Sequence, residues 1–421
     1  MWWFIIMLLI FQWNARSLIA NGQEFKKFIF DLDKKPDILC IQETWLKPQL
    51  NFVLQGYICI RRDRKQGNGG GVATFIKQGV GYRNVEMSVD QEVLVIEVWE
   101  KKQSIKVINF YNPCEKLSRK KLENIRGNIN QKVVWCGDFN AHNSLWGSVK
   151  TDSNGLIVED MLDWGQLVCI NNGSVTRIDV NNGRKSVLDI TLVSENLARK
   201  CEWHVSNQSF FNQSTLGSDH YPIRCQIGVD IVRSLVERIP RWKFKAANWK
   251  LFKELCNKNM REMVDIEDIE ELSRKISEVL RNTAGEVIGK KKIISGRKAV
   301  PWWNEDCSKA VRERNKAMKK ARKSLVYNDY INYKRAQAKV RKEIRIAKRT
   351  FWREFCNKIG ENIEINDVWN MIRKMGGIRR INNIPVLVSD GKVAIKDSDK
   401  AEILVDTFAK VHSNDNISES M

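Results

Sequence analysis

The chain has 421 residues, and 43% of them are hydrophobic, which is enough to bury at least one large core and excludes a wholly disordered protein. Lys and Arg outnumber Asp and Glu by 71 to 50, so the net charge of +21 predicts a polyanionic partner, either nucleic acid or an acidic membrane surface. The 10 cysteines form no C-x-x-C pair and stand beside no histidine at zinc-ligand spacing, which argues against a zinc site and indicates a reducing compartment.

The chain opens on an apolar run, Met1–Phe11, which could be a signal peptide, a membrane anchor or a buried strand. The run has neither the basic start nor the small-residue cleavage site of a signal peptide. Its length of about eleven residues is well below the roughly 20 that are needed to span a bilayer. We therefore predict a buried first strand and no membrane partner.

From Phe11 to about Gly228, short apolar runs alternate with turn clusters, which is the pattern of a mixed β-sheet with covering helices. Helices are expected near Gln23–Leu32, Arg119–Gln131 and Gly155–Gly165. The expected strands are, in order, IIMLLIFQW, DILCIQE, GYICIRR, GGVATFIK, VLVIEVW, IKVINFY, KVVWCGD, VCINNGS, SVLDITLVS and YPIRCQI. Roughly ten strands in this length fit two packed sheets better than one open sheet.

The residues after Asp230 have a helical pattern, with apolar residues at three-to-four spacing in Ile266–Ile288 and Ala310–Phe355, and no sheet is evident there. Residues 229–421 hold 43 basic and 27 acidic side chains, whereas residues 1–228 hold 28 and 23. We expect one mixed-sheet domain over 1–228, a helical linker over 229–300, a basic helical connector over 301–375 and a further region over 376–421. The basic stretch is either a solvated helix face or coiled coil, or a phosphate-binding surface with interleaved aromatic residues, Tyr327, Tyr330, Tyr333 and Trp352.

Four short motifs place polar or acidic groups at the ends of apolar strands: QET at 42–44, GDFN at 137–140, LDI at 188–190 and GSDH at 217–220. Each motif alone is more often structural than functional. Sheet folds gather strand ends into one crevice, so together the motifs predict one pocket that holds Glu43, Asp138, Asp189, Asp219 and His220.

These residue types suit phosphodiester cleavage, which needs an oxygen-rich site for a hard cation, a proton acceptor and donors for the charge that grows on the phosphoryl oxygens. Glu43 and Asp219 suit Mg²⁺, and Asp138 can orient water or a metal. Asn140 can donate to the phosphate. Imidazole titrates near neutral pH, so His220 is suited to proton transfer, with a nearby carboxylate to fix its tautomer.

Seven motifs occur in order over residues 11–228: QWNARSL, ILCIQETWL, GGGVATFIK, INFYNP, VVWCGDFNAHNSLWGS, SVLDITLV and GSDHYPI. In these motifs the chain resembles the DNase I-like endonuclease/exonuclease/phosphatase superfamily, and within it the endonuclease domain of non-LTR retrotransposons. The resemblance implies a four-layer α/β sandwich, a Mg²⁺ or Mn²⁺ cofactor, and hydrolysis of DNA that leaves a 3′-hydroxyl.

The resemblance also implies roles for single residues. The matching positions are the early metal-site pair Asn14 and Glu43, completed by Asp219; the phosphate-contacting Tyr111; the water- and phosphate-positioning pair Asp138 and Asn140; and the dyad Asp189 and His220. The sequence departs from the family after the tyrosine, where Tyr111-Asn112-Pro113-Cys114 has one proline and the family more often has two. His142 is interpreted as a residue that stabilises its motif by a hydrogen bond.

A turn is expected between Thr176 and Asp189, because Asn181-Asn182-Gly183 supplies residues that tolerate positive φ. The hairpin would project beside the dyad and bind DNA through Thr176, Arg184 and Lys185, sensing groove width and flexibility. In the retrotransposon endonucleases that the chain resembles, a hairpin at this position influences target choice. The alternative is an ordinary surface turn with two solvated cations.

The segment Pro301–Cys307, followed by a basic helix, resembles the connector between endonuclease and reverse transcriptase in the same elements. The chain has no Asp-Asp dipeptide to serve as a polymerase metal pair, so we expect a truncated reading frame without a reverse transcriptase. We expect DNA as the partner, RNA as a further partner of the basic C-terminal helices, and the nucleus as the location, or the cytoplasm without import. Three other functions stay open: an abasic-site repair endonuclease, a phosphatase or sphingomyelinase of the same fold, and an inactive nucleic-acid-binding remnant.

Overall fold

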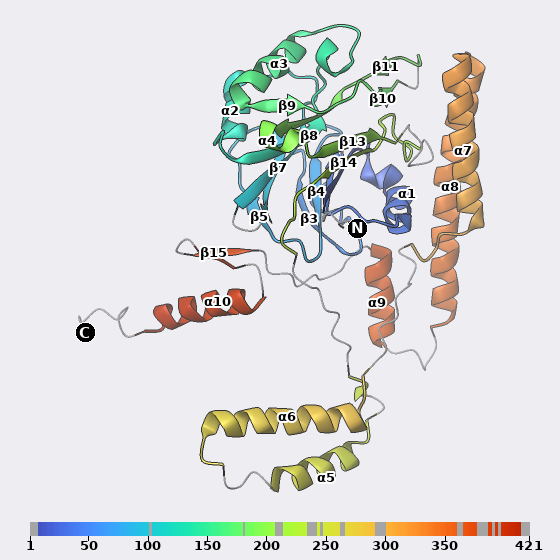
Figure 1. Cartoon of the computed structure of the whole chain (residues 1–421). Coiled ribbons are helices and arrows are strands. Elements are labelled where there is room, and N and C mark those ends of the chain that lie inside the picture. The colour runs from blue at the N-terminus through green and yellow to red at the C-terminus, as the bar shows by residue number, and fades with distance from the viewer. Residues whose placement is uncertain are drawn as a thin grey trace, which may run out of the picture. The chain divides into compact units, whose positions relative to one another are not determined.

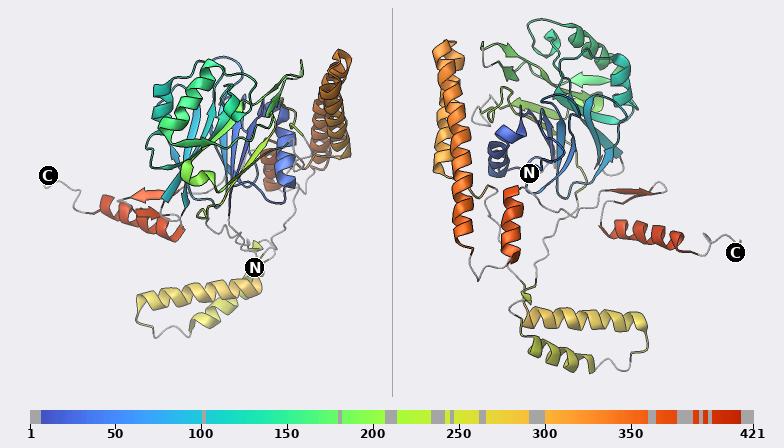
Figure 2. Two further views of the ribbon diagram at one scale, coloured as in Figure 1. Left: turned by 45° about the horizontal axis from the view of Figure 1, so that its top comes forward. Right: turned by 180° about the vertical axis from the view of Figure 1, so that it is seen from behind.

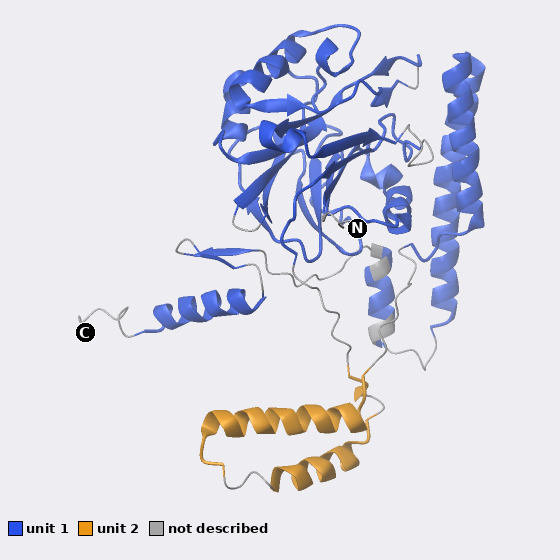
Figure 3. Cartoon of the chain, in the orientation of Figure 1, with its two compact units in different colours: residues 1–234, 299–421 blue, residues 235–298 orange. Residues whose placement is uncertain are grey.

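The computed structural model describes residues 7–100, 103–179, 182–206, 214–233, 242–244, 247–261, 266–290, 300–359, 365–376, 386–389, 392–394 and 397–413. The chain divides into two compact units, one of residues 1–234 and 299–421 and one of residues 235–298 (Figure 3). The start of the predicted first strand and Asn181 of the predicted turn lie outside the described residues.

One six-stranded mixed sheet has β1 and β2 at its centre and the order β13-β14-β1-β2-β4-β3. Its strands are β1 (Leu8–Asn14), β2 (Ile38–Gln42), β3 (Tyr57–Arg62), β4 (Val72–Lys77), β13 (Cys201–Val205) and β14 (Ile223–Ile227). β1 pairs in parallel with β2 and antiparallel with β14. All residues of β1 are buried, so the prediction of a buried first strand is confirmed for the described part.

The second six-stranded mixed sheet has β7 and β8 at its centre and the order β5-β6-β7-β8-β12-β9. Its strands are β5 (Tyr82–Val85), β6 (Glu92–Glu100), β7 (Gln103–Tyr111), β8 (Lys132–Asp138), β9 (Leu167–Cys169) and β12 (Asp189–Ser194). β7 and β8 are parallel, and β12 runs antiparallel to β8.

The two sheets pack face to face and carry helices on their outer faces (Figures 1 and 2). Alternate residues of both sheets, such as Ile10 and Cys136, form the core between them. Phe11 and Trp13, on the other face of β1, pack with α1 (Leu18–Asp31). The outer face of the second sheet packs against α2 (Arg119–Arg126) and α3 (Ser153–Gly165). The predicted four-layer α/β sandwich is therefore confirmed.

Helix boundaries differ from the prediction where capping decides them. α1 begins before the expected Gln23 because the Ser17 hydroxyl accepts a hydrogen bond from the backbone N–H of Ala20, at 3.2 Å. α2 ends at Arg126, short of the expected Gln131, because Gly127 adopts φ 62° and leaves the helical conformation. Short elements complete this part of the chain: η1 (Ser144–Trp146) and α4 (Glu195–Ala198).

Some strands were not predicted, and one was predicted too long. β5 and β13 were missed. The hairpin expected between Thr176 and Asp189 is confirmed by the antiparallel pair β10 (Arg177–Ile178) and β11 (Lys185–Ser186). The run VCINNGS forms only β9, Leu167–Cys169, because Asn171, Asn172 and Gly173 are turn-forming residues.

Beyond the sandwich, the same unit contains long helices. These are α7 (Glu305–Ser324), α8 (Tyr327–Asn357), α9 (Ile365–Gly376) and α10 (Asp397–Val411). The predicted helical stretch Ala310–Phe355 is two helices, because Leu325 adopts φ 56° and ends α7. The prediction that no sheet follows Asp230 is wrong: β15 (Leu387–Ser389) pairs with β16 (Lys392–Ala394), strands too short to give a visible alternation. Among the described residues, no helix is both long enough and apolar enough to cross a membrane.

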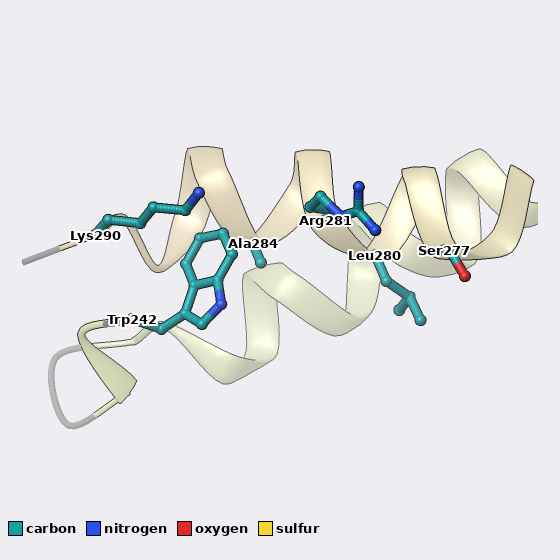
Figure 4. A pocket seen from close by; sticks show the side chains of 6 residues that line it. All are labelled: Trp242, Ser277, Leu280, Arg281, Ala284 and Lys290. Carbon is teal, nitrogen blue, oxygen red and sulfur yellow. The ribbon is translucent and has the colours of Figure 1, made fainter. Parts of the chain in front are cut away.

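The small unit consists of α5 (Trp249–Met260) and α6 (Ile269–Val287), with a bridge between Trp242 and Lys290. A surface hollow of this unit is lined by Trp242, Ser277, Leu280, Arg281, Ala284 and Lys290 (Figure 4). The lining holds no carboxylate, so the hollow offers no oxygen-rich site to a hard cation.

Candidate active site

The central strands of both sheets end at one edge of the sandwich. Parallel pairing puts Asn14, the end of β1, opposite Gln42, the end of β2, and puts Tyr111 opposite Asp138 at the ends of β7 and β8. β12 is antiparallel to β8, so its first residue, Asp189, lies opposite Asp138 at the same edge. The motifs therefore meet because strand direction brings their ends together.

Asp138, Asp189 and His220 form a buried cluster whose ligand atoms all lie within 4.8 Å of one another. The Asp189 Oδ2 is 2.7 Å from the His220 Nδ1, and the Asp138 Oδ2 is 3.8 Å from the His220 Nε2. One ring nitrogen thus faces each carboxylate. The exposed fraction of each of these side chains is 5% or less, so water does little to screen their charges.

A second group of hydrogen bonds connects this cluster to Glu43. The Asn14 Nδ2 donates to the Asp138 Oδ2 at 2.9 Å and to the Glu43 Oε1 at 3.0 Å. The Tyr111 hydroxyl donates to the same Glu43 oxygen at 3.1 Å. Burial, with the neighbouring Glu43 and Asp138 carboxylates, raises the pKa of Tyr111, which keeps the phenol protonated and able to donate.

Burial and the neighbouring charges shift the pKa values of Asp138 and His220. Burial, with the nearby Asp189 carboxylate, raises the pKa of Asp138 to about 7, although His220 opposes the shift. Burial by itself lowers the pKa of His220, but the Asp189 and Asp138 carboxylates outweigh that effect and raise the pKa to about 10. At neutral pH the imidazole is therefore a cation, and Asp138 is a carboxyl group that can both hold and release a proton.

Asn140 lies beside Asp138 in the left-handed conformation, which asparagine adopts more readily than most residues do. Its backbone N–H donates to the Asp138 Oδ1 at 3.1 Å, and its Nδ2 donates to the Asn112 carbonyl at 2.7 Å. The side chain is half-buried, and the second hydrogen of its amide can still serve a ligand. Asn140 has φ 45°, and Glu43 has φ 48°, so two site residues adopt the left-handed conformation.

Asp219 is paired with two arginines that were not predicted as site residues. The Arg177 Nε donates to the Asp219 Oδ2 at 3.0 Å, and the Arg16 Nη1 lies 3.4 Å from the same oxygen. Burial alone would raise the pKa of Asp219, but His220 and the two arginines lower it, so it stays ionised. That Asp219 also holds a metal stays a prediction.

The three predicted DNA-binding residues, in the turn beside the dyad, differ in their exposure to solvent. Thr176 is fully buried, and its hydroxyl oxygen accepts hydrogen bonds from the backbone N–H groups of Leu188 and Asp189, at 3.1 and 3.2 Å. Thr176 therefore positions Asp189 and has no exposed side chain to offer a duplex. Arg184 and Lys185 are exposed.

Comparison with known proteins finds similar sequences for this part of the chain. Residues 105–224 match the family model described as endonuclease-reverse transcriptase. The resemblance to retrotransposon endonucleases, predicted from the motifs, is confirmed.

Two similar curated proteins come from Drosophila melanogaster. The RNA-directed DNA polymerase from mobile element jockey is 24% identical over 216 residues, which are 50% of this chain and 23% of that protein. The putative 115 kDa protein in type-1 retrotransposable element R1DM is 23% identical over 298 residues, 65% of this chain and 28% of that protein. The chain thus spans about a quarter of the length of these relatives.

Similar solved structures include the endonuclease domain of TRAS1, a telomere-specific non-LTR retrotransposon, with 19% identity and a TM-score of 0.44. That alignment covers 52% of this chain and 98% of the other. An AP endonuclease from Archaeoglobus fulgidus is 20% identical, with a TM-score of 0.39, and the alignment covers 52% of this chain and 98% of the other.

The site at this edge of the sandwich has the donors that a hard cation requires. Carboxylate oxygens of Glu43, Asp138 and Asp189 gather at the site, and the buried Asp189 Oδ1 has no hydrogen-bond partner among the described residues. Such oxygen donors suit Mg²⁺ or Mn²⁺, whereas a zinc site would favour thiolate or several imidazole ligands. The residues present therefore fit a metal site for a hard cation.

Proposed function

We propose that this domain is a metal-dependent nuclease that nicks DNA and leaves a 3′-hydroxyl. The observation that carries the proposal is the buried cluster of Asp138, Asp189 and His220, linked through Asn14 to Glu43. A structural ion pair needs one acid and one base. Here several carboxylates and one imidazolium share a single site at a sheet edge, which is the arrangement that proton transfer at a phosphate requires.

A bound Mg²⁺ or Mn²⁺ would polarise the scissile phosphate and neutralise its growing charge. Glu43 and the neighbouring Asn14 are the residues proposed to hold it, and Asp219 is proposed to act with them. Asp219 is negatively charged despite its burial, because His220 and the two arginines lower its pKa.

The side chains of the cluster supply the proton transfers. The attacking water gives its proton to Asp138, whose raised pKa makes it a suitable acceptor near neutral pH. The water oxygen bonds to phosphorus, the P–O3′ bond breaks, and the departing O3′ takes a proton from solvent. The protonated His220 donates from Nε2 to a phosphoryl oxygen, because Asp189 already occupies Nδ1.

DNA is the proposed substrate because cations surround the cluster. Arg16 keeps 51% of its side chain exposed while it contacts Asp219, and Arg184 and Lys185 are exposed on the neighbouring turn. Duplex phosphates attract such groups without regard to sequence. The basic helices α7 and α8 are proposed to add further phosphate contacts, to DNA and also to RNA.

The test uses the full chain and matched substrates. With Mg²⁺ the chain should nick intact supercoiled plasmid, and a DNA polymerase should extend the nicks without prior phosphatase treatment, because the ends carry a 3′-hydroxyl. An oligonucleotide with a single abasic site is the comparison. Cleavage confined to the abasic strand would contradict the proposal and indicate a repair endonuclease instead. Nicks that need phosphatase treatment before extension would contradict hydrolysis that leaves a 3′-hydroxyl.

A further inference from the structure

The helices α7 and α8, here called the helical hairpin, contact the loop that carries His220. This loop, residues 214–221, is called the His220 loop. The Thr215 hydroxyl donates to the Met318 Sδ at 3.5 Å. The Gln337 Nε2 donates to the Gly217 carbonyl at 3.4 Å. These interactions come from both helices and act on a loop that is more than 100 positions away in sequence from Met318.

The helical hairpin also contacts Tyr221 through a cation–aromatic interaction. The Arg322 guanidinium of α7 stands 4.8 Å from the ring centroid of Tyr221, and it also donates to the Tyr221 hydroxyl. Tyr221 follows His220 in the chain and is itself 5% exposed. Stacking and a hydrogen bond together fix the ring more firmly than either would alone.

The His220 loop has a backbone that requires support. Leu216 adopts φ 54° and Gly217 φ 88°, and the left-handed conformation is unfavourable for a leucine. A Cβ at Gly217 would lie 2.7 Å from the Asn21 Oδ1 and 3.1 Å from the Gln337 Nε2. The helical hairpin therefore forms one wall of the space in which this strained segment fits.

The helical hairpin is itself anchored to the sandwich by a buried ion pair. The Arg314 Nη1 and Nη2 lie 2.6 and 2.8 Å from the two carboxylate oxygens of Glu24 on α1. The Arg314 side chain is 1% exposed, and the Glu24 side chain is 9% exposed. A two-point interaction between planar groups fixes orientation as well as distance, so α7 has a defined position over the loop.

The sandwich also holds the loop from its inner side. The Ser218 hydroxyl donates to the Asn14 carbonyl at 2.8 Å, and the Tyr221 N–H donates to the Thr176 carbonyl at 2.7 Å. The helical hairpin adds restraint on the opposite side, at Thr215, Gly217 and Tyr221. His220 lies between the restrained positions, and its distance to Asp138 depends on both sides.

We propose that the helical hairpin is a brace that positions the His220 loop, with Met318 and Arg322 as positioning residues for His220. The inference rests on the proposed nuclease function. Displacement of a catalytic group by about 1 Å can lower a rate by about 100-fold. Removing the Met318 or Arg322 side chain should therefore lower kcat by about 10- to 100-fold and leave KM nearly unchanged.

The test compares three variants of the full chain with one control variant. Met318→Ala removes a neutral side chain, so any effect on turnover cannot arise from a weaker attraction to phosphate. Arg322→Ala removes the stacking cation, and Arg322→Lys restores the charge and part of the stacking. Asn332→Ala is the control, because Asn332 is an exposed neutral residue of α8, in the same helical hairpin. It should leave both kcat and the binding of DNA unchanged.

A second readout does not depend on activity. Backbone amide exchange of residues 215–221, without metal or DNA, should speed up about tenfold in Met318→Ala and Arg322→Ala and stay unchanged in Asn332→Ala. If Met318→Ala does not fold, Gln337→Ala takes its place, because it removes only the bond to the Gly217 carbonyl.

Normal turnover or unchanged exchange in both brace variants would overturn the inference. A wild-type chain that does not nick would instead contradict the proposed function, while the exchange comparison would still decide whether the helical hairpin holds the loop.

Discussion

At the scale of single residues, Asp189 is the most informative position for the chemistry. Asp189→Asn removes the charge that stabilises the His220 imidazolium at 2.7 Å and leaves the shape unchanged. We expect nicking to slow by about 100- to 10,000-fold, because the His220 ring loses the carboxylate that fixes its tautomer and stabilises its positive charge. Binding of DNA should stay nearly constant. Single-turnover nicking and a binding titration measure the two effects, with the exposed Asp163→Asn as control; equal losses of binding and rate would contradict the role.

Asp138 makes a prediction about pH and stability in the absence of metal. Its pKa rises from 3.8 to about 7 on folding, so the folded state favours the protonated form. The resulting penalty is absent below about pH 4, grows as the pH rises to about 7, and is constant above that. Asp138→Asn should therefore raise the Tm in EDTA at pH 8 and leave it unchanged at pH 4. A lower Tm for the variant at pH 8 would show that the carboxylate is not destabilised by burial.

Site residues were predictable from the sequence where they belong to motifs and unpredictable where they depend on distant partners. Glu43, Asp138 and His220 follow recognisable strand ends. Arg177 was missed, because its ion pair with Asp219 joins residues 42 positions apart. Thr176 was assigned to DNA from its place in a turn, and only its burial reveals that it supports Asp189.

At the scale of elements, the ion pair between α1 and α7 predicts a strong asymmetry between single and double substitutions. Glu24→Ala leaves the buried Arg314 without a carboxylate to balance its charge, and such a change is expected to reduce the free energy of unfolding by about 3–5 kcal/mol. The double variant Glu24→Leu with Arg314→Met should be more stable than Glu24→Ala, because no unpaired charge remains. Denaturant unfolding measures both. Equal losses in the two proteins would mean that the pair is not buried in solution.

The turn beside the dyad is the element proposed to influence where the domain cuts. Arg184→Ala with Lys185→Ala removes two exposed cations and leaves β10 and β11 in place. We expect nick positions on a long duplex to be redistributed while dependence on metal and on His220 is retained. Sequencing of the nick ends gives the map. An unaltered map of nick positions would contradict a role of this turn in the choice of cleavage sites.

The elements themselves were predicted where the apolar runs are long. β1, β7 and β8 are buried over most of their length and are rich in apolar residues, which made them visible in the sequence. β15 and β16 have three residues each, and β10 and β11 have two, so periodicity could not reveal them. The division of one helical stretch into α7 and α8 depends on a leucine at positive φ, which sequence patterns disfavour.

At the scale of the whole molecule, the uneven charge predicts how binding responds to salt. Most of the net charge of +21 lies after residue 228. Neutralising the exposed α7 cations Lys316, Lys319 and Lys323 should flatten the slope of log affinity against log salt by about one for each phosphate that these lysines neutralise. A fluorescence titration at several salt concentrations measures the slope. An unchanged slope would identify this face as merely solvated.

The measurement that decides between an active nuclease and an inactive remnant is nicking of covalently closed plasmid by the full chain. We expect relaxed circles with Mg²⁺ or Mn²⁺, none in EDTA, and none with Mg²⁺ in an Asp138→Asn variant that is folded by its thermal unfolding curve. Nicking that persists in EDTA or in the Asp138→Asn variant would contradict a metal-dependent reaction at the buried Asp138, Asp189 and His220 cluster.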